Sequence, residues 1–336
     1  MQTFHFNRPF QLESGHELPE LTIAYHTYGT LKPQSKVVWI CHALTANSDA
    51  ADWWKGVIGE GEVINPQEYF IVCANIIGSC YGTTGPLSTD PRTGKPYYHS
   101  FPLITIRDMV RAHILLRQHL GIDQIHLLMG GSMGGYQVLE WSVMEPEAIS
   151  QLFLLATSPT ESAWGIAVHT TQRLAIEADA SWKEQHPDAG SAGLKAARAI
   201  GMLTYRNYGI MVKHQTDPDH SKLDHYRASS YIHYQGEKLV KRFNAFSYWS
   251  LTKTMDSHHL GRGRQGDVEA VLQNIQQRTL IVGISSDILC PVEEQRFIQR
   301  QLPNASLIEI DSAYGHDGFM VEGKMISEEL GKWLKK

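Results

Sequence analysis

The segment that most constrains the fold is residues 125–136, IHLLMGGSMGGY, in which an apolar run leads directly into a glycine-rich turn. The turn has the pattern Gly-x-Ser-x-Gly with Ser132 at its centre, and a helix-like segment follows from Tyr136. A strand that ends in this pattern and continues into a helix is typical of a nucleophile elbow, which exposes a serine hydroxyl on a sharp turn. Such a turn needs small neighbours, which Gly130 and Gly134 supply. By itself the motif also fits a glycine-rich turn without chemistry.

Length and composition bound the class of protein. The chain has 336 residues, of which 42% are hydrophobic and 19% charged, as expected for one large globular domain or a core domain with an insertion. The formal net charge of −5 provides no electrostatic footprint for nucleic acid. No apolar run approaches the roughly 20 residues of a membrane span, and the N-terminal stretch lacks the pattern of a signal peptide.

The cysteines and histidines show no metal-binding spacing. The four cysteines, which have no Cys-x-x-Cys pairing, are Cys41, Cys73, Cys80 and Cys290. The 17 histidines include no His-Glu-x-x-His pair. The sequence therefore predicts reduced thiols in a cytoplasmic protein and no metal site.

Strand-like and helix-like segments alternate along the chain. Short apolar runs typical of buried strands occupy residues 37–40, 69–74, 125–129, 151–156, 278–284 and 305–310, and residues 21–28 alternate like an edge strand. Helical periodicity covers residues 105–120 and 325–333. This order favours a mostly parallel central sheet with helices on both faces. With the elbow, it predicts the α/β-hydrolase fold.

The pattern changes in the middle of the chain. Between residues 161 and 265 strand signals vanish, and residues 192–205 and 226–243 have helical character. We interpret residues 161–265 as a helical lid inserted into a core domain formed by residues 1–160 and 266–336. A lid is favoured over a second independent helical domain because ligands of open α/β sheets bind at the carboxyl ends of the strands, where this insertion would cover them.

The remaining members of a catalytic triad should follow the serine in the order acid, then histidine. Asp287 directly follows an apolar strand, and His316 lies in a glycine-flanked loop after the next one. In this arrangement His316 takes the proton of Ser132, and Asp287 fixes the imidazole tautomer. One expected oxyanion donor is the backbone N–H of Met133, and the other is that of Leu44 or Thr45, in the loop after an earlier strand.

Long stretches of the chain resemble one family, the homoserine O-acetyltransferases. The similarity covers nearly the whole chain and includes the segments CHALT at 41–45, NIIGSCYGTTGP at 75–86, FPLITIRD at 101–108, the elbow at 130–135, YRASSYIHYQG at 226–236, SSD at 285–287 and YGHD at 314–317. The resemblance implies transfer of an acetyl group from acetyl-CoA to the hydroxyl of L-homoserine, on the route to methionine, by a ping-pong mechanism through an acyl-serine. It also implies a cytoplasmic homodimer that packs through its lid helices, with acetyl-CoA as co-substrate and no permanently bound cofactor.

The resemblance assigns the triad to the same three residues and adds a role for Asp317, which matches the acidic residue that contacts the amino acid substrate. The partner of the substrate carboxylate is less well defined, because an arginine usual in the family is not matched in residues 209–216; Arg206 and Lys213 are the candidates. Another departure is Ala46, where the family commonly has glycine; alanine adopts a positive φ less readily.

Two other activities fit the same triad. One is a serine or homoserine O-succinyltransferase, which would need a cation in the acyl pocket. The other is a carboxylesterase-type hydrolase, in which water is the acceptor.

Overall fold

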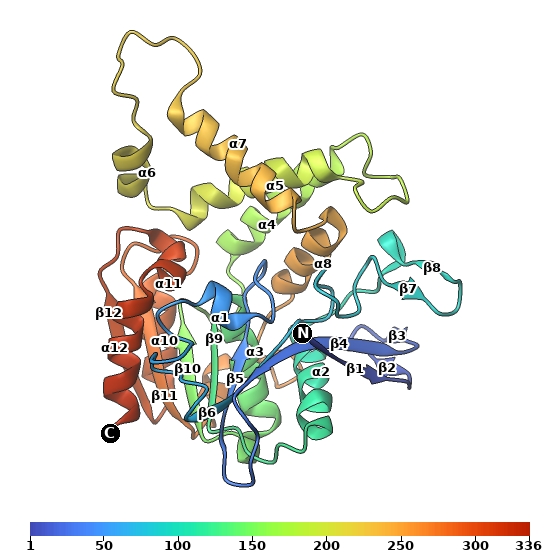
Figure 1. Cartoon of the computed structure of the whole chain (residues 1–336), viewed down its shortest axis with the longest axis vertical. Coiled ribbons are helices and arrows are strands. Elements are labelled where there is room, and N and C mark those ends of the chain that lie inside the picture. The colour runs from blue at the N-terminus through green and yellow to red at the C-terminus, as the bar shows by residue number, and fades with distance from the viewer.

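The computed structural model describes all 336 residues and is built on one mixed eight-stranded sheet (Figure 1). The strands lie in the spatial order β1 (Gln2–Phe6), β4 (Leu21–Tyr28), β6 (Tyr69–Ala74), β5 (Lys36–Cys41), β9 (Leu127–Gly131), β10 (Gln151–Leu155), β11 (Arg278–Ile284) and β12 (Ala305–Ile310). The six strands from β6 to β12 are parallel, whereas β1 and β4 pair antiparallel. Two short hairpins, β2 (Phe10–Gln11) with β3 (Glu17–Leu18) and β7 (Thr89–Asp90) with β8 (Lys95–Pro96), lie outside this sheet.

The predicted edge position of residues 21–28 is wrong. This segment forms β4, which pairs with β1 on one side and β6 on the other. The edge is instead β1, for which the sequence analysis expected no strand. β1 has no fully buried residue, so its sequence carries little of the hydrophobic signal that marks a strand.

Both faces of the sheet are buried. Along β5 the neighbours Val38 and Trp39 belong to two different apolar clusters, and along β10 Phe153 and Leu154 do the same. Successive side chains of a strand point to opposite faces, so these clusters are the two cores of a layered structure. The fold is therefore the predicted α/β-hydrolase arrangement of a mostly parallel sheet covered on both sides.

The helices of the core divide between the two faces. One cluster contains side chains from α2 (Ile106–His119), α3 (Met133–Met144), α9 (Val268–Gln273) and α10 (Val292–Gln301). The other contains side chains from α1 (Ala50–Trp53), α11 (Gly318–Val321) and α12 (Gly323–Leu334). Three single turns of 3-10 helix complete the core: η1 (Tyr98–Ser100), η2 (Pro146–Ala148) and η3 (Gly315–Asp317).

Of the six helices between β10 and β11, all but α9 project from one side of the sheet (Figure 1). They are α4 (Ala163–Glu177), α5 (Ser191–Tyr205), α6 (Tyr208–Gln215), α7 (Arg227–Val240) and α8 (Ala245–Asp256). A β-bridge between Thr160 and His259 joins the two ends of this insertion. Asp256 on α8 then binds two side chains of α4, His169 at 3.0 Å and Arg173 at 2.5 Å. We call these five helices the lid.

No helix of the chain combines the length and the apolar character needed to cross a membrane.

The contact between α3 and the end of β5 leads to a stability prediction. A methyl group on Gly134 would overlap the carbonyl oxygen of Cys41. We expect Gly134→Ala to lower the free energy of unfolding by about 1–3 kcal/mol, because the packed backbone cannot relax without strain. Gly331→Ala is the matched control: its methyl group would make only an ordinary contact with Val63 at 3.5 Å, and alanine favours helix. Thermal unfolding of both variants measures the difference, and equal midpoints would contradict the expectation.

Candidate active site

Ser132 occupies a strained turn between β9 and α3. Its φ and ψ are 53° and −127°, in the left-handed half of the map that residues with side chains rarely adopt. The turn is held by its backbone: the Ser132 N–H donates to Leu155 O at 2.9 Å, and its carbonyl accepts from the Thr157 hydroxyl at 2.8 Å. Strain of this kind persists only where the surroundings enforce it, and it is common at functional sites.

The structure brings together the three side chains that the sequence analysis selected. His316 Nε2 lies 2.9 Å from the hydroxyl of Ser132, and His316 Nδ1 lies 2.6 Å from a carboxylate oxygen of Asp287. All three are buried, with 7%, 3% and 4% of Ser132, His316 and Asp287 exposed. Hydrogen bonds thus run from nucleophile to base to acid, as serine activation requires.

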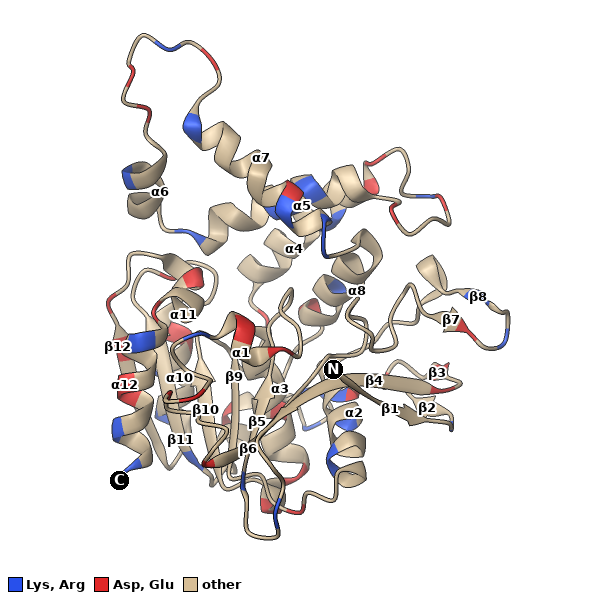
Figure 2. Ribbon diagram, viewed as in Figure 1, with Lys and Arg blue, Asp and Glu red and all other residues tan.

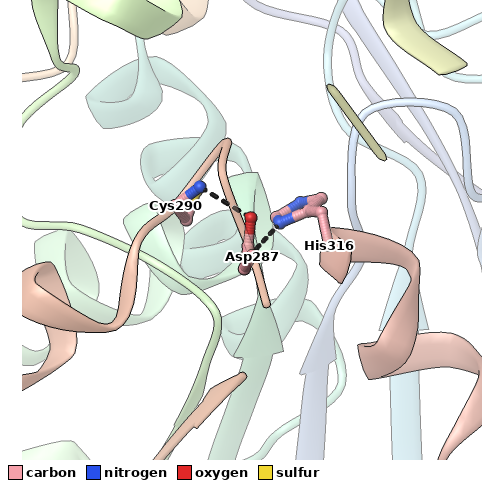
Figure 3. Close-up of side chains that lie close together, drawn as sticks. All are labelled: Asp287, Cys290 and His316. Carbon is pink, nitrogen blue, oxygen red and sulfur yellow. Dashed lines mark hydrogen bonds and ion pairs between the residues drawn. The ribbon is translucent and has the colours of Figure 1, made fainter. Parts of the chain in front are cut away.

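Asp287 is fixed by the turn that follows β11. One carboxylate oxygen accepts the backbone N–H groups of Leu289 at 2.8 Å and Cys290 at 2.9 Å, and the other faces His316 (Figure 3). This arrangement leaves the carboxylate able only to accept from the imidazole, so the proton of neutral His316 lies on Nδ1. Nε2 then carries the lone pair that takes the serine proton.

Two opposing effects set the pKa of His316. Burial lowers this pKa, but the negative charge of Asp287 and its hydrogen bond raise it, with smaller contributions from Asp317 and Glu161. The net result is a pKa above the ordinary value of 6.5. The base is therefore stronger than a free imidazole, and the imidazolium formed during the reaction is stabilised in place.

Asp287, His316 and Cys290 also place three metal-ligating atoms within 4.8 Å of one another. The chemistry of these atoms does not favour a metal. The carboxylate and both imidazole nitrogens are engaged in the hydrogen bonds described above, and burial raises the pKa of the Cys290 thiol well above its usual range. A neutral thiol is a poor metal ligand. We therefore interpret these three residues as part of the hydrogen-bonded triad and the turn that holds Asp287, and not as a metal site.

The two expected oxyanion donors lie at the start of α3 and in the turn after β5. Met133 is the first residue of α3, a position whose N–H has no acceptor within the helix. Leu44 lies in a turn over residues 43–46 that is closed by the Ala46 N–H on the Ala43 carbonyl at 3.1 Å. The N–H of a residue in the second position of such a turn remains free. Ala46 does not have a positive φ, so its replacement of the family's glycine introduces no backbone strain.

The relay opens into a cavity of about 390 Å³ between core and lid. Ser132, His316 and Leu44 lie on its core side, together with Asp317. Its lid side carries four cations, from α5, α7 and the segments that follow them: Arg198, Arg206, Lys238 and Arg242. Figure 2 shows several Lys and Arg positions where α5 and α7 cross.

Asp317 and Arg206 both line the cavity and pair with each other. Arg206 Nε lies 3.0 Å from Asp317 Oδ2. Burial raises the pKa of Asp317, while Arg206, Arg198 and His316 act in the opposite direction. The charge of Arg206 is thus already compensated by the residue with which it was expected to share the substrate.

The sequence analysis missed Arg198, which lines the same cavity from the middle of α5. Its guanidinium lies 5.2 Å from the centre of the Tyr205 ring, and it has no carboxylate partner within salt-bridge distance. The other candidate, Lys213, is exposed on α6 and does not line the cavity. An arginine inside a helix resembles any solvated helical residue in sequence, so only its orientation toward the cavity distinguishes Arg198.

Comparisons with known sequences agree with the fold and identify related proteins. A family described as alpha/beta hydrolase fold matches residues 36–323. Curated relatives named homoserine O-acetyltransferase include one from Cyclobacterium marinum, 45% identical over 96% of this chain and 91% of the relative. Another, from Chlorobaculum parvum, is 47% identical over 95% of this chain and 90% of the relative.

Solved structures give the same fold. A homoserine O-acetyltransferase from Staphylococcus aureus superposes with a TM-score of 0.83 at 29% identity, covering 100% of this chain and 95% of that one. One from Bacillus anthracis gives 0.92 at 24% identity, covering 100% and 97%. An acetylester hydrolase from Corynebacterium glutamicum gives 0.88 at 21% identity, covering 100% and 96%. At the two lower identities the likeness establishes the fold alone.

The charge of Asp287 leads to a pH prediction. In the unaltered protein, the acidic limb of kcat/KM should lie above pH 6.5, because the base must be neutral and the pKa of His316 is raised. In Asp287→Asn, burial becomes the main influence on that pKa, so the limb should move to lower pH. The same change should lower kcat by about 10⁴-fold, because the tautomer is no longer fixed. Rates measured from pH 5 to 9 test both statements, and an unmoved limb would assign the pKa to another group.

Proposed function

The chain belongs to the homoserine O-acetyltransferases of the α/β-hydrolase fold, and we propose that it transfers an acetyl group from acetyl-CoA to the hydroxyl of L-homoserine, a step of methionine biosynthesis. This proposal rests on the set of residues that line one cavity. A buried serine–histidine–aspartate relay opens beside Asp317 and Arg198, a carboxylate and a cation of the kind that a free amino acid requires. A simple ester offers no charges for such a pair.

The first half of the reaction acylates the enzyme. His316 removes the proton of Ser132 while the serine oxygen attacks the thioester carbonyl of acetyl-CoA. The resulting oxyanion accepts hydrogen bonds from the Leu44 and Met133 amides. When the intermediate collapses, the carbon–sulfur bond breaks, and the leaving sulfur takes the proton from His316. Free CoA departs and the acetyl group remains on Ser132.

The second half transfers the acetyl group to the amino acid. His316 accepts the proton of the homoserine hydroxyl, whose oxygen attacks the acetyl-serine carbonyl. Collapse of this second intermediate releases O-acetylhomoserine and returns the proton to Ser132. Water competes for the same ester, so an acceptor that is bound and oriented has an advantage in effective concentration. The lid shields the ester from water and carries part of the acceptor site.

Recognition of homoserine is assigned to charges on both sides of the cavity. Asp317, adjacent to the base, binds the ammonium group. Arg198 binds the carboxylate, because it lines the cavity and has no carboxylate partner of its own. Arg206 orients Asp317 through the ion pair at 3.0 Å. This assignment gives the carboxylate to Arg198 in place of Arg206 and Lys213, the two candidates from the sequence.

The free cation also supports one alternative. A succinyl group carries a carboxylate, and Arg198 would be able to bind it if the acyl group pointed toward the lid. The donor therefore has to be measured.

A homodimer packed through the lid is part of the proposal. Nine large apolar side chains of the lid are exposed: Trp164, Ile166, Leu174, Leu203, Tyr208, Val212, Leu223, Tyr226 and Tyr234. Exposed apolar surface concentrated on one part of a protein marks an interaction site. Sedimentation velocity should find the mass of two chains, and a monomer would contradict this part of the proposal. The four free cysteines support a cytoplasmic location.

Release of free CoA tests the activity directly. Purified protein is mixed with acetyl-CoA or succinyl-CoA, with homoserine, serine or no acceptor, and the thiol is followed. We expect fast release only with acetyl-CoA and homoserine together, and none with Ser132→Ala. Release of CoA at the same rate with and without an amino acid would indicate a hydrolase. Faster release from succinyl-CoA than from acetyl-CoA would identify succinyl-CoA as the donor.

Arg198→Gln tests the acceptor site. The variant should raise KM for homoserine by about 10- to 100-fold, the loss expected for a hydrogen-bonded charge pair. Acylation of Ser132 by p-nitrophenyl acetate should not change, because that ester carries no carboxylate. Arg300→Gln, at an exposed position of α10, is the matched control. An unchanged KM for homoserine would show that Arg198 does not bind the homoserine carboxylate and would favour Arg206 instead.

A further inference from the structure

The direction of one peptide group decides whether Leu44 can serve the oxyanion. Its N–H belongs to the same rigid plane as the Ala43 carbonyl, and in a trans peptide these two groups point in opposite directions. The chain contains no cis peptide bond. Any contact that fixes the Ala43 carbonyl therefore also fixes the direction of the Leu44 N–H.

Besides the Ala46 N–H, which closes the turn at 3.1 Å, His42 contacts that carbonyl from its side chain. Its Nδ1 lies 2.9 Å from the Ala43 carbonyl oxygen, and its Nε2 lies 3.2 Å from the backbone nitrogen of Ile76. The Ile76 N–H can only donate, so Nε2 carries the lone pair and the ring proton lies on Nδ1. The imidazole then donates to the Ala43 carbonyl. Its orientation is fixed from the far side by the loop after β6, which contains Ile76.

Complete burial keeps this ring neutral. His42 has no exposed surface, and burial lowers its pKa to about 4, with His113 acting in the same direction and the bond to Ala43 opposing it. A neutral ring is required, because a protonated Nε2 would oppose the Ile76 N–H. The proposed chemistry gives this histidine no proton to transfer, and its ring does not line the cavity.

The second oxyanion donor is tied to the same residue. Gln137 on α3 donates from Nε2 to the His42 carbonyl at 3.2 Å and to the Met133 carbonyl at 3.1 Å. Its own Oε1 lies 3.0 Å from Nε2 of buried His113. One side-chain amide therefore bridges the loop that carries Leu44 and the helix turn that begins at Met133.

We propose that His42 is a positioning residue for the oxyanion hole: its Nδ1–H holds the peptide between Ala43 and Leu44 so that the Leu44 N–H faces the reacting carbonyl, and Gln137 holds this loop in register with Met133. The inference rests on the proposed acyl-serine chemistry. It extends that chemistry to two buried residues that never touch the substrate.

Two amide substitutions separate the two nitrogens of the ring. Asn places its side-chain nitrogen near the position of Nδ1 and keeps the donor to Ala43. Gln places its amide near the position of Nε2, so it can accept from Ile76 but no longer holds the Ala43 carbonyl. We expect His42→Gln to slow acylation of Ser132 about 10- to 100-fold, since loss of a whole donor costs about 10²–10³-fold. His42→Asn should stay within about threefold of the unaltered protein, because its donor is retained.

The readouts are the acylation rate, the Michaelis constants and the thermal midpoint. A misdirected oxyanion donor lowers kcat and leaves KM for acetyl-CoA and homoserine unchanged, because it acts mainly on the transition state. Gln137→Met, a variant of similar length, should lower kcat in the same way and provides the test if His42→Gln does not fold. His258→Gln is the control, because His258 is also buried and neutral but lies near the Ser158 carbonyl, at 3.3 Å.

His42→Gln that acylates at the unaltered rate would overturn the proposal. Equal kinetic losses in His42→Asn and His42→Gln, following their thermal midpoints, would also overturn it, because they would indicate a purely structural role. Acylation is followed with p-nitrophenyl acetate, which needs no homoserine. Failure of the proposed acceptor or donor would appear in the CoA assay of the unaltered protein, and the His42 comparison would still decide this inference.

Discussion

Gly134 lies so close to the carbonyl oxygen of Cys41 that no side chain fits between them, and the active site depends on this contact between two pieces of backbone. It brings the first turn of α3 against the end of β5. Ser132 precedes that turn, and the loop with Leu44 follows that strand. A nucleophile and two amide donors are thereby placed around one point, before any lid residue contributes.

The chemistry and the recognition come from different parts of the chain. The relay and the oxyanion donors belong to the core, where burial and short hydrogen bonds fix each group. Arg198, the cation of the proposed acceptor site, belongs to the lid. The two parts meet at the base: a methyl group on Gly315 would lie 2.9 Å from the backbone nitrogen of Asn207 and 3.0 Å from the Tyr205 carbonyl. The loop that carries His316 is therefore packed directly on the lid.

The sequence analysis performed best where local chemistry requires a residue type. Ser132, Asp287 and His316 each follow a buried strand, and strand ends on a parallel sheet meet at one edge, so order and context were enough to select them. The central strands were also predictable, because both of their faces are buried and their sequences are continuously apolar. β1 was not predicted because all five of its residues are partly or fully exposed.

Roles that depend on where a side chain points, or on which of its atoms donates, were not predictable from the sequence. The sequence offered Arg206 and Lys213 and missed Arg198, because only the structure shows that Arg206 pairs with Asp317 and that Arg198 lines the cavity without an acidic partner. His42 stood inside a segment used only as a family signature. Its role follows from its tautomer, which is set by the backbone N–H of Ile76 in the loop after β6.

The position of the lid within the chain has a consequence for protein synthesis. Because the lid is inserted between β10 and β11, it separates the serine from both groups that activate it. A ribosome makes the nucleophile 184 residues before the imidazole. Nascent chains and products truncated before His316 therefore carry a serine without its base, so the serine cannot be activated as a nucleophile.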